Sequence, residues 1–222
     1  KAVRSARLLW LHRLAMTRSL IVMPTANALG YYKNTSEEGH TDPNRDFPFM
    51  QNAEKCMQTL TARALNELFR DHLFQIAITF HGGMQAIAYE WGSPNHQGKG
   101  KDVSPDDTAQ AKIAGAMASY GGKGDYSSNR KYPARPMNSL VYPVNGGMED
   151  WAYAATWDDL KKTVTPCKAN GYPSDRTVYE NKGMLRILNI LVETSDNKRP
   201  KESDLGAPIG VFLPGATDHA GN

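Results

Sequence analysis

The chain has 222 residues, enough for one large domain with a sizeable hydrophobic core. Hydrophobic residues make up 40% of it and charged residues 22%, which is ordinary for a globular protein. The net charge of +3 is too small, and the basic residues are too dispersed, to favour nucleic acid as a partner. No apolar stretch reaches the roughly 18 residues that a membrane-spanning helix needs. We therefore expect a single domain over residues 1–222, with no nucleic-acid partner and no membrane span.

In the first half of the chain we expect a helix over residues 2–14, a short buried strand over 20–23, a polar loop over 25–50, a helix over 52–72 and strands over 76–80 and 87–89. A loop over 92–104 then leads to a helix over 104–120 that is capped by Ser104. In the last part we expect a loop over 121–136, a helix over 148–156, a turn-rich segment over 163–183 and a strand over 185–192. Strands that alternate with helices in this way indicate an α/β layered domain.

The two ends and the two cysteines say little about the compartment. The chain starts at Lys1 without a methionine and in the middle of a helical pattern, and it closes on a loop-like segment. We expect a fragment that lacks both ends, so a signal peptide would be invisible, and a cytoplasmic and a secreted location both stay open. Cys56 and Cys167 lie far apart without metal-type spacing, and we expect free thiols rather than a disulfide.

Two ionisable residues stand at the carboxyl ends of predicted strands. Ile76–Phe80 runs directly into His81-Gly82-Gly83, and the strand over 185–192 delivers Glu193. This edge of an open α/β sheet is where such proteins hold their ligands and chemistry. Each residue also has an ordinary interpretation: His81 as an imidazole hydrogen-bonded at a strand end, and Glu193 as a carboxylate in water.

Two further segments carry polar groups of possible function. Asn44-Arg45 lies in the polar loop, and Tyr142 precedes a glycine-bearing segment that leads into Glu149. Taken separately they are weak signals, because an arginine in a loop is most often a surface ion pair and a tyrosine is most often a half-buried aromatic.

The order and wording of these segments resemble the M14 zinc carboxypeptidase family (carboxypeptidase A/B-like). The matching segments, between about residues 20 and 200, are Asn27–Tyr31, Asp42–Pro48, Thr79–Gly83, Tyr142–Trp151 and Leu191–Thr194. The resemblance implies the family's fold, a three-layer α/β domain with a mixed, largely parallel central sheet and helices on both faces. It also implies a zinc-dependent metallocarboxypeptidase that removes the C-terminal residue of a peptide or protein, and we expect it to act as a monomer.

The resemblance assigns a role to each position. His81 would be the last of three zinc ligands, since neutral imidazole is a good zinc donor. Glu193 would be the general base that takes a proton from zinc-bound water and passes it to the leaving amine. Asn44 and Arg45 would hold the terminal carboxylate of the substrate, and Tyr142 would close over the bound peptide.

Glu149 falls where the family places a residue at the base of the pocket for the terminal side chain. An acidic residue there goes with lysine or arginine, so the resemblance implies a preference for basic C-terminal residues. The alternative is that Glu149 only stabilises the start of the short helix in which it lies.

The chain departs from the family in three ways. The other two zinc ligands belong to a His-x-x-Glu motif, and none of the six histidines has a glutamate three positions later. We expect those ligands upstream of Lys1, so that the chain alone binds zinc poorly and hydrolyses little. Residues 32–38 lack the arginine that polarises the scissile carbonyl, and Lys33 could act there only as a point charge. We also expect the family's C-terminal helix to be missing from this chain.

Two alternatives stay open on these grounds. A catalytically inactive relative would bind peptide C-termini with Asn44, Arg45 and Tyr142 without cutting them. An amidase-like relative would act on a non-protein amide, although the Asn-Arg pair argues for a free carboxylate.

Overall fold

The computed structural model describes residues 2–98, 103–121, 131–154, 166–178 and 187–198. The chain divides into two compact units, Lys1–Ser36 and Glu37–Asn222. The single domain expected over 1–222 remains a prediction. No helix in the described part is both long enough and apolar enough to cross a bilayer.

The first unit contains two helices, α1 (Ala2–Thr17) and α2 (Ala28–Lys33). Asn27 caps α2, because its Oδ1 accepts a hydrogen bond of 2.9 Å from the backbone N–H of Gly30. The strand predicted over 20–23 is wrong: the backbone there forms no strand, and Val22 is 78% exposed. An apolar run becomes a strand only where a neighbouring strand completes its hydrogen bonds.

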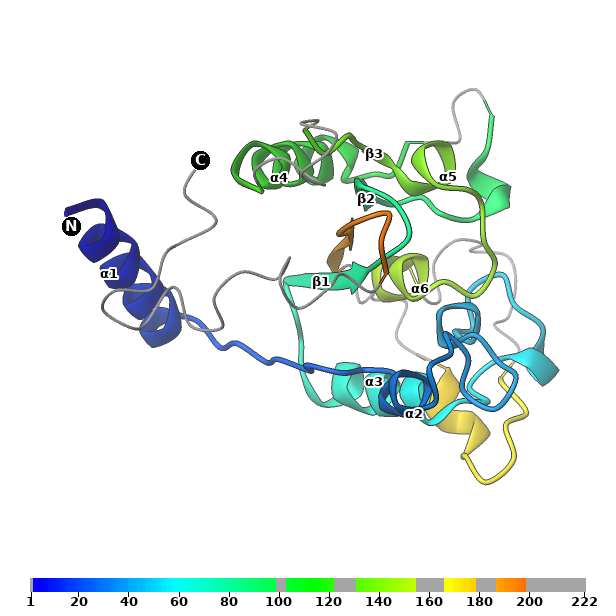
Figure 1. Ribbon diagram of the computed structural model, residues 1–222. Coiled ribbons are helices and arrows are strands. Elements are labelled where there is room, and N and C mark those ends of the chain that lie inside the picture. Colours follow the sequence, from blue (N-terminus) through cyan, green and yellow to red (C-terminus); the bar gives the residue numbers. More distant parts are fainter. Residues whose placement is uncertain (1, 99–102, 122–130, 155–165, 179–186, 199–222) are drawn as a thin grey trace. The chain divides into compact units, whose positions relative to one another are not determined.

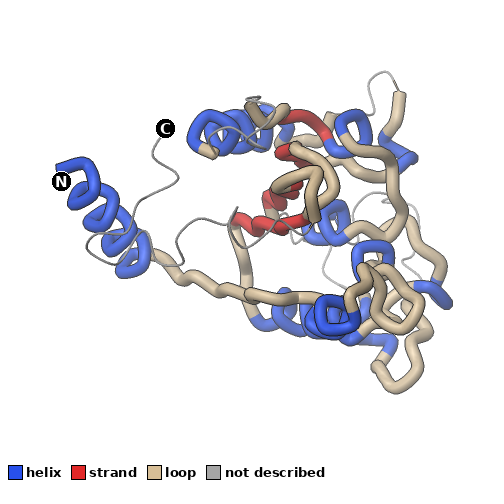
Figure 2. The backbone as a smooth tube through the Cα atoms, viewed as in Figure 1, coloured by secondary structure: helices blue, strands red, loops and turns tan. Residues whose placement is uncertain are grey.

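The second unit holds one sheet, with described strands in the order β1-β4-β2-β3 (Figures 1 and 2). The strands are β1 (Ile76–His81), β2 (Ala86–Tyr89), β3 (Ala134–Pro136) and β4 (Leu188–Glu193). β1 runs parallel to β4, β2 runs antiparallel to β4, and β2 runs parallel to β3. The expected α/β fold with a mixed, mostly parallel sheet is therefore confirmed.

Side chains alternate between the two faces of this sheet, and different helices cover each face. Helix α4 (Asp107–Tyr120) packs on the face that carries Ile87, Ile190 and Val192. The opposite face presents Ala88 and Leu191 to a second apolar cluster that includes residues of α5 (Met137–Leu140). Figure 1 shows α4 alongside β2 and β3. Helices thus lie on both faces, as expected.

The helices predicted over 52–72, 104–120 and 148–156 are present with shifted bounds, and the parts of the predicted segments over 122–130, 155–165 and 179–186 lie outside the described residues. The other α-helices are α3 (Leu60–Asp71) and α6 (Met148–Ala154), and the 3₁₀ turns are η1 (Pro43–Arg45), η2 (Ala53–Lys55), η3 (Pro94–His96) and η4 (Ser174–Thr177). Helix α4 starts later than predicted, because Ser104 donates its hydroxyl to Gln110 instead of capping the helix. Strand β3 lies within the loop predicted over 121–136, helix α2 lies within the loop predicted over 25–50, and α5 was not predicted.

Strand β1 is less buried than its apolar sequence predicts. Ile76, Ile78 and Phe80 are 49%, 46% and 72% exposed. These three side chains share one face of β1, which is an edge strand of the described sheet. The alternation of half-buried and exposed side chains along β1 still directs His81 to the less exposed side.

The main core lies beneath α6 and α3. The Trp151 ring packs against Phe47 and Phe69 at centroid distances of 4.8 and 5.3 Å. Within this cluster, Cys56 and Cys167 form a disulfide with a Cα–Cα distance of 5.5 Å. The prediction of free thiols is therefore wrong, because the fold joins cysteines that lie 111 positions apart in the sequence.

Candidate active site

His81 and Glu193 lie side by side at one edge of the sheet. They are register partners at the carboxyl ends of the parallel strands β1 and β4. Thr194 holds the two ends together, since its backbone N–H and its hydroxyl both donate to the His81 carbonyl, at 3.0 and 2.9 Å. The parallel pairing of two apolar strands thus delivers an imidazole and a carboxylate to the same place.

The carboxylate of Glu193 is largely buried. Glu193 is 9% exposed, and its Oε2 has no hydrogen-bond partner among the described residues. Burial raises the pKa of Glu193, the nearby charge of Glu149 adds to the rise, and the charges of His81 and Lys198 partly oppose it. A carboxylate with a raised pKa and an unsatisfied oxygen is suited to accept and release a proton.

Glu149 projects from the first turn of α6 toward the end of β1. Its side chain is completely buried, and its Oε1 lies 3.6 Å from Nε2 of His81. Thr79, two residues before His81 on the same strand face, donates its hydroxyl to the same oxygen at 3.0 Å. Burial by itself raises the pKa of Glu149, but the contacts with His81 and Thr79 outweigh it and hold the pKa below its ordinary value.

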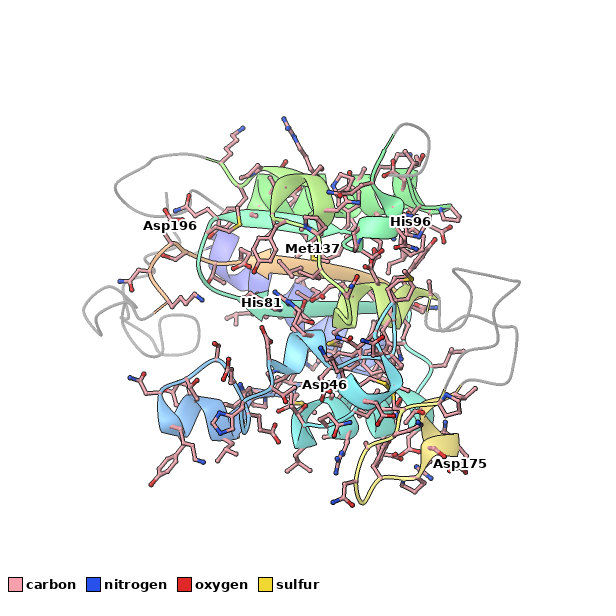
Figure 3. The ribbon with its side chains drawn as sticks, turned by 90° about the vertical axis from the view of Figure 1, so that its right-hand side faces the viewer. Asp46, His81, His96, Met137, Asp175 and Asp196 are labelled. Atoms are coloured by element: carbon pink, nitrogen blue, oxygen red, sulfur yellow. A yellow bond between two sulfur atoms is a disulfide. The ribbon has the colours of Figure 1, made fainter. Side chains whose placement is uncertain are left out.

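The groups around His81 raise the pKa of its imidazole, whereas those around Glu149 lower the pKa of its carboxyl. Burial alone lowers the pKa of its imidazole, whereas the carboxylates of Glu149, Glu193 and Asp42 together raise it above its ordinary value. In Figure 3, His81 lies above the segment that carries Asp46.

Asn44 and Arg45 approach the sheet edge from the 3₁₀ turn η1. Asn44 donates its Nδ2 to Oε2 of Glu149 at 3.2 Å. Arg45 donates Nη1 to the Asn44 carbonyl at 2.7 Å and Nη2 to the hydroxyl of Tyr142 at 3.2 Å. The guanidinium also lies 5.8 Å from the centre of the Tyr142 ring. The amide, the guanidinium and the phenol thus form one connected polar group.

This segment is fixed to the rest of the unit at two points. Asp46 is fully buried and accepts bonds from the N–H of Gln58, the N–H of Thr59 and the hydroxyl of Thr59, at 2.9, 2.6 and 2.7 Å. At Gly146, φ is +70° and an added Cβ would come within 2.3 Å of the Arg45 carbonyl oxygen. Only glycine allows this close approach in a left-handed conformation.

The structure thus brings together Asn44, Arg45, His81, Tyr142, Glu149 and Glu193, all within the second unit. Lys33 belongs to the first unit, so it stays a prediction as a charge near the scissile bond. Sequence reasoning overlooked Thr79 as a partner of the site. The signal was available, because residues two apart on a strand share a face.

Within the described residues, no group of three His, Cys, Asp or Glu side chains could hold a metal ion. His81 suits one ligand position, with an imidazole at a rigid strand end beside a carboxylate. The described residues do not complete a catalytic zinc site, which usually takes three protein ligands.

Comparison with known proteins bears on the same residues. The sequence profile of the zinc carboxypeptidase family matches residues 10–182, which is more than half of the chain. The chain belongs to the zinc carboxypeptidase family. The matched range includes Asn44, Arg45, His81, Tyr142 and Glu149 and ends before Glu193.

The chain is similar to the curated protein carboxypeptidase SOL1 of Arabidopsis thaliana, and the two sequences are 25% identical over 200 residues. That alignment covers 86% of the chain but 40% of the relative. The chain thus spans about two fifths of the length of this carboxypeptidase relative.

Proposed function

We propose that the protein containing this chain is a zinc-dependent carboxypeptidase that hydrolyses the C-terminal residue of peptides. The supporting observation is the linked arrangement at one sheet edge. Glu193 and His81 are register partners, and His81 connects through Glu149 to Asn44 and the guanidinium of Arg45. A base and a carboxylate-binding pair around one site suit the removal of a terminal residue.

Asn44 and Arg45 bind the free carboxylate of the substrate in this proposal. One Nδ2 hydrogen of Asn44 is directed to Glu149, which leaves the second for the substrate. Arg45 contributes a planar set of donors that can hold both carboxylate oxygens. Tyr142 already contacts Arg45 and is 56% exposed, so it can cover a peptide that is bound there.

Glu193 is the general base. Its buried Oε2 is free to accept a proton from the attacking water, and its raised pKa makes it a stronger base that holds this proton until the leaving amine takes it. Zinc, held by His81 together with ligands outside the described set, would polarise the carbonyl and make the water more acidic.

The substitution Glu193→Gln in the complete protein tests this function. The amide keeps the shape of the side chain but cannot accept the proton, so we expect turnover to fall by roughly 10²–10⁴-fold. Zinc content, measured by atomic emission, should be unchanged. Turnover near that of the wild type would remove the assigned role.

We further propose a preference for basic C-terminal residues, which rests on the position of Glu149 in the family's pattern. The check is the ratio of kcat/KM for two peptides that differ only in a C-terminal Lys or Phe. A ratio well above one supports the preference, and equal values remove it.

A second candidate is a non-catalytic protein that binds peptide C-termini. It is favoured by the lack of a three-ligand metal group in the described residues and by the lack of an arginine in residues 32–38. The complete protein distinguishes the two. Binding of free-carboxylate peptides without zinc and without hydrolysis supports this candidate, and zinc-dependent hydrolysis excludes it.

A further inference from the structure

Glu149 is placed so that its charge must be satisfied inside the protein. Glu149 and the adjacent Asp150 are both 0% exposed. A buried carboxylate is stable as an anion only when hydrogen-bond donors or cations surround it. The contacts of its two oxygens therefore identify the groups to which it is tied.

The two oxygens of Glu149 contact two different parts of the site. Oε1 accepts from the hydroxyl of Thr79 and lies 3.6 Å from Nε2 of His81, both on β1. Oε2 accepts from Nδ2 of Asn44 at 3.2 Å, on η1. One carboxylate thus bridges the strand that carries the imidazole and the turn that carries the terminus-binding amide.

The amide of Asn44 is held from both sides. Its Oδ1 accepts from the backbone N–H of Met148 at 2.8 Å, and this bond determines which end of the amide is the oxygen. The Nδ2 atom of Asn44 must then face Oε2 of Glu149. This oxygen can accept a hydrogen bond when the carboxyl group is ionised, or when it is the carbonyl oxygen of the protonated group. The orientation of Asn44 therefore depends on Glu149.

We propose that Glu149 is a positioning residue that fixes the imidazole of His81 and the amide of Asn44 relative to each other. The inference rests on the proposed function, in which those two groups serve the metal and the peptide terminus. This role is separate from the proposed selection of a basic side chain, because it concerns the contacts of Glu149 with Thr79, His81 and Asn44 in the wall of the site. It also predicts the tautomer of His81: its Nε2, which lies 3.6 Å from Oε1 of Glu149, carries a hydrogen.

The tautomer is measured first on the complete wild-type protein with ¹⁵N-labelled histidine. Long-range ¹H–¹⁵N correlation spectra report which ring nitrogen carries a proton, and loss of the signal in His81→Gln assigns it. The proposal requires a proton on Nε2, whether the ring is neutral or charged. A ring protonated at Nδ1 alone overturns it, and this measurement needs no substitution of Glu149.

The second measurement compares Glu149→Gln with Glu90→Gln. A carboxamide has one acceptor oxygen, so Gln at position 149 cannot serve both Asn44 and the β1 side. We expect the His81 signal to change and kcat/KM on free-carboxylate peptides to fall by roughly 10–100-fold. Glu90 is equally buried and bonds Gln110 and the Asn189 N–H, so its variant should leave the His81 signal unchanged.

An unchanged His81 signal in Glu149→Gln overturns the proposal, whatever happens to the activity. If Glu149→Gln does not fold, the wild-type tautomer alone decides. Failure of the proposed function is distinguishable, since it would appear as full turnover in Glu193→Gln, and the ring measurement does not depend on turnover.

Discussion

The side chain and the backbone of Arg45 make separate hydrogen bonds. Its guanidinium bonds the Asn44 carbonyl and the Tyr142 hydroxyl, and its own carbonyl accepts a 2.7 Å bond from Gln51. The backbone contacts hold the residue in place without the side chain, so its removal should not disturb the segment. This separation makes Arg45 a clean position at which to test the binding of a peptide terminus.

We expect Arg45→Ala to raise KM for peptides with a free C-terminus much more than for the same peptides with an amidated end. The physical reason is that only the free carboxylate forms the charge-assisted pair with the guanidinium. Steady-state kinetics or calorimetry on matched peptides provides the comparison. An equal effect on both peptides would count against the clamp.

At the scale of elements, the disulfide joins two segments with little regular structure of their own. Cys56 follows η2, and Cys167 precedes the segment that contains η4. The Lys168 N–H also donates to the Ala53 carbonyl at 2.8 Å, so the covalent link reinforces a short backbone contact. A bridge between residues 111 positions apart removes many conformations from the unfolded chain.

We expect the double substitution Cys56→Ala and Cys167→Ala to lower the free energy of unfolding by about 2–5 kcal/mol. Urea unfolding with and without a reducing agent provides the measurement. The wild type should lose stability on reduction, whereas the double variant serves as the control and should not respond. Identical urea midpoints for the oxidised and reduced wild type would show that the bridge contributes nothing.

At the scale of the whole molecule, buried carboxyls next to the site connect stability to pH. Asp150 accepts a 2.8 Å bond from the Gly92 N–H, and burial raises its pKa to about 7 from an ordinary value of 3.8. Burial also raises the pKa of Glu90 well above its ordinary value, with a contribution from the charge of Asp150. The folded protein therefore binds protons more tightly than the unfolded chain at these positions.

The sign of the effect follows from this difference. Between about pH 4 and pH 7 the folded state holds more protons at Asp150, so its contribution to the free energy of unfolding falls as the pH rises. Asp150→Asn keeps an oxygen for Gly92 but removes the titration. We expect the stability of the variant relative to wild type to increase over this range, by up to about 1.4 kcal/mol per pH unit.

Urea unfolding at several pH values between 4 and 8 measures this dependence. The exposed Asp71 provides a control, since Asp71→Asn removes a carboxyl that lies outside this buried group. A constant difference between Asp150→Asn and wild type across the range would contradict the prediction.

The sequence alone determined the local features that depend on neighbouring residues. Apolar β-branched runs predicted β1 and β4 and placed His81 and Glu193 at their ends. Such predictions are possible because a run of neighbouring apolar residues by itself indicates a strand. The order of short segments also pointed to the zinc carboxypeptidase family, which the comparison confirmed.

Only the tertiary structure decided the features that need distant partners. The Cys56–Cys167 bridge, the exposed face of β1 and the absence of a strand over 20–23 depend on which segments become neighbours, and no local pattern contains that information. The same holds for Glu149, whose sequence position indicated a specificity pocket. Its buried contacts with His81, Thr79 and Asn44 exist only because α6, β1 and η1 meet at one place, where a carboxylate without those partners would be unstable.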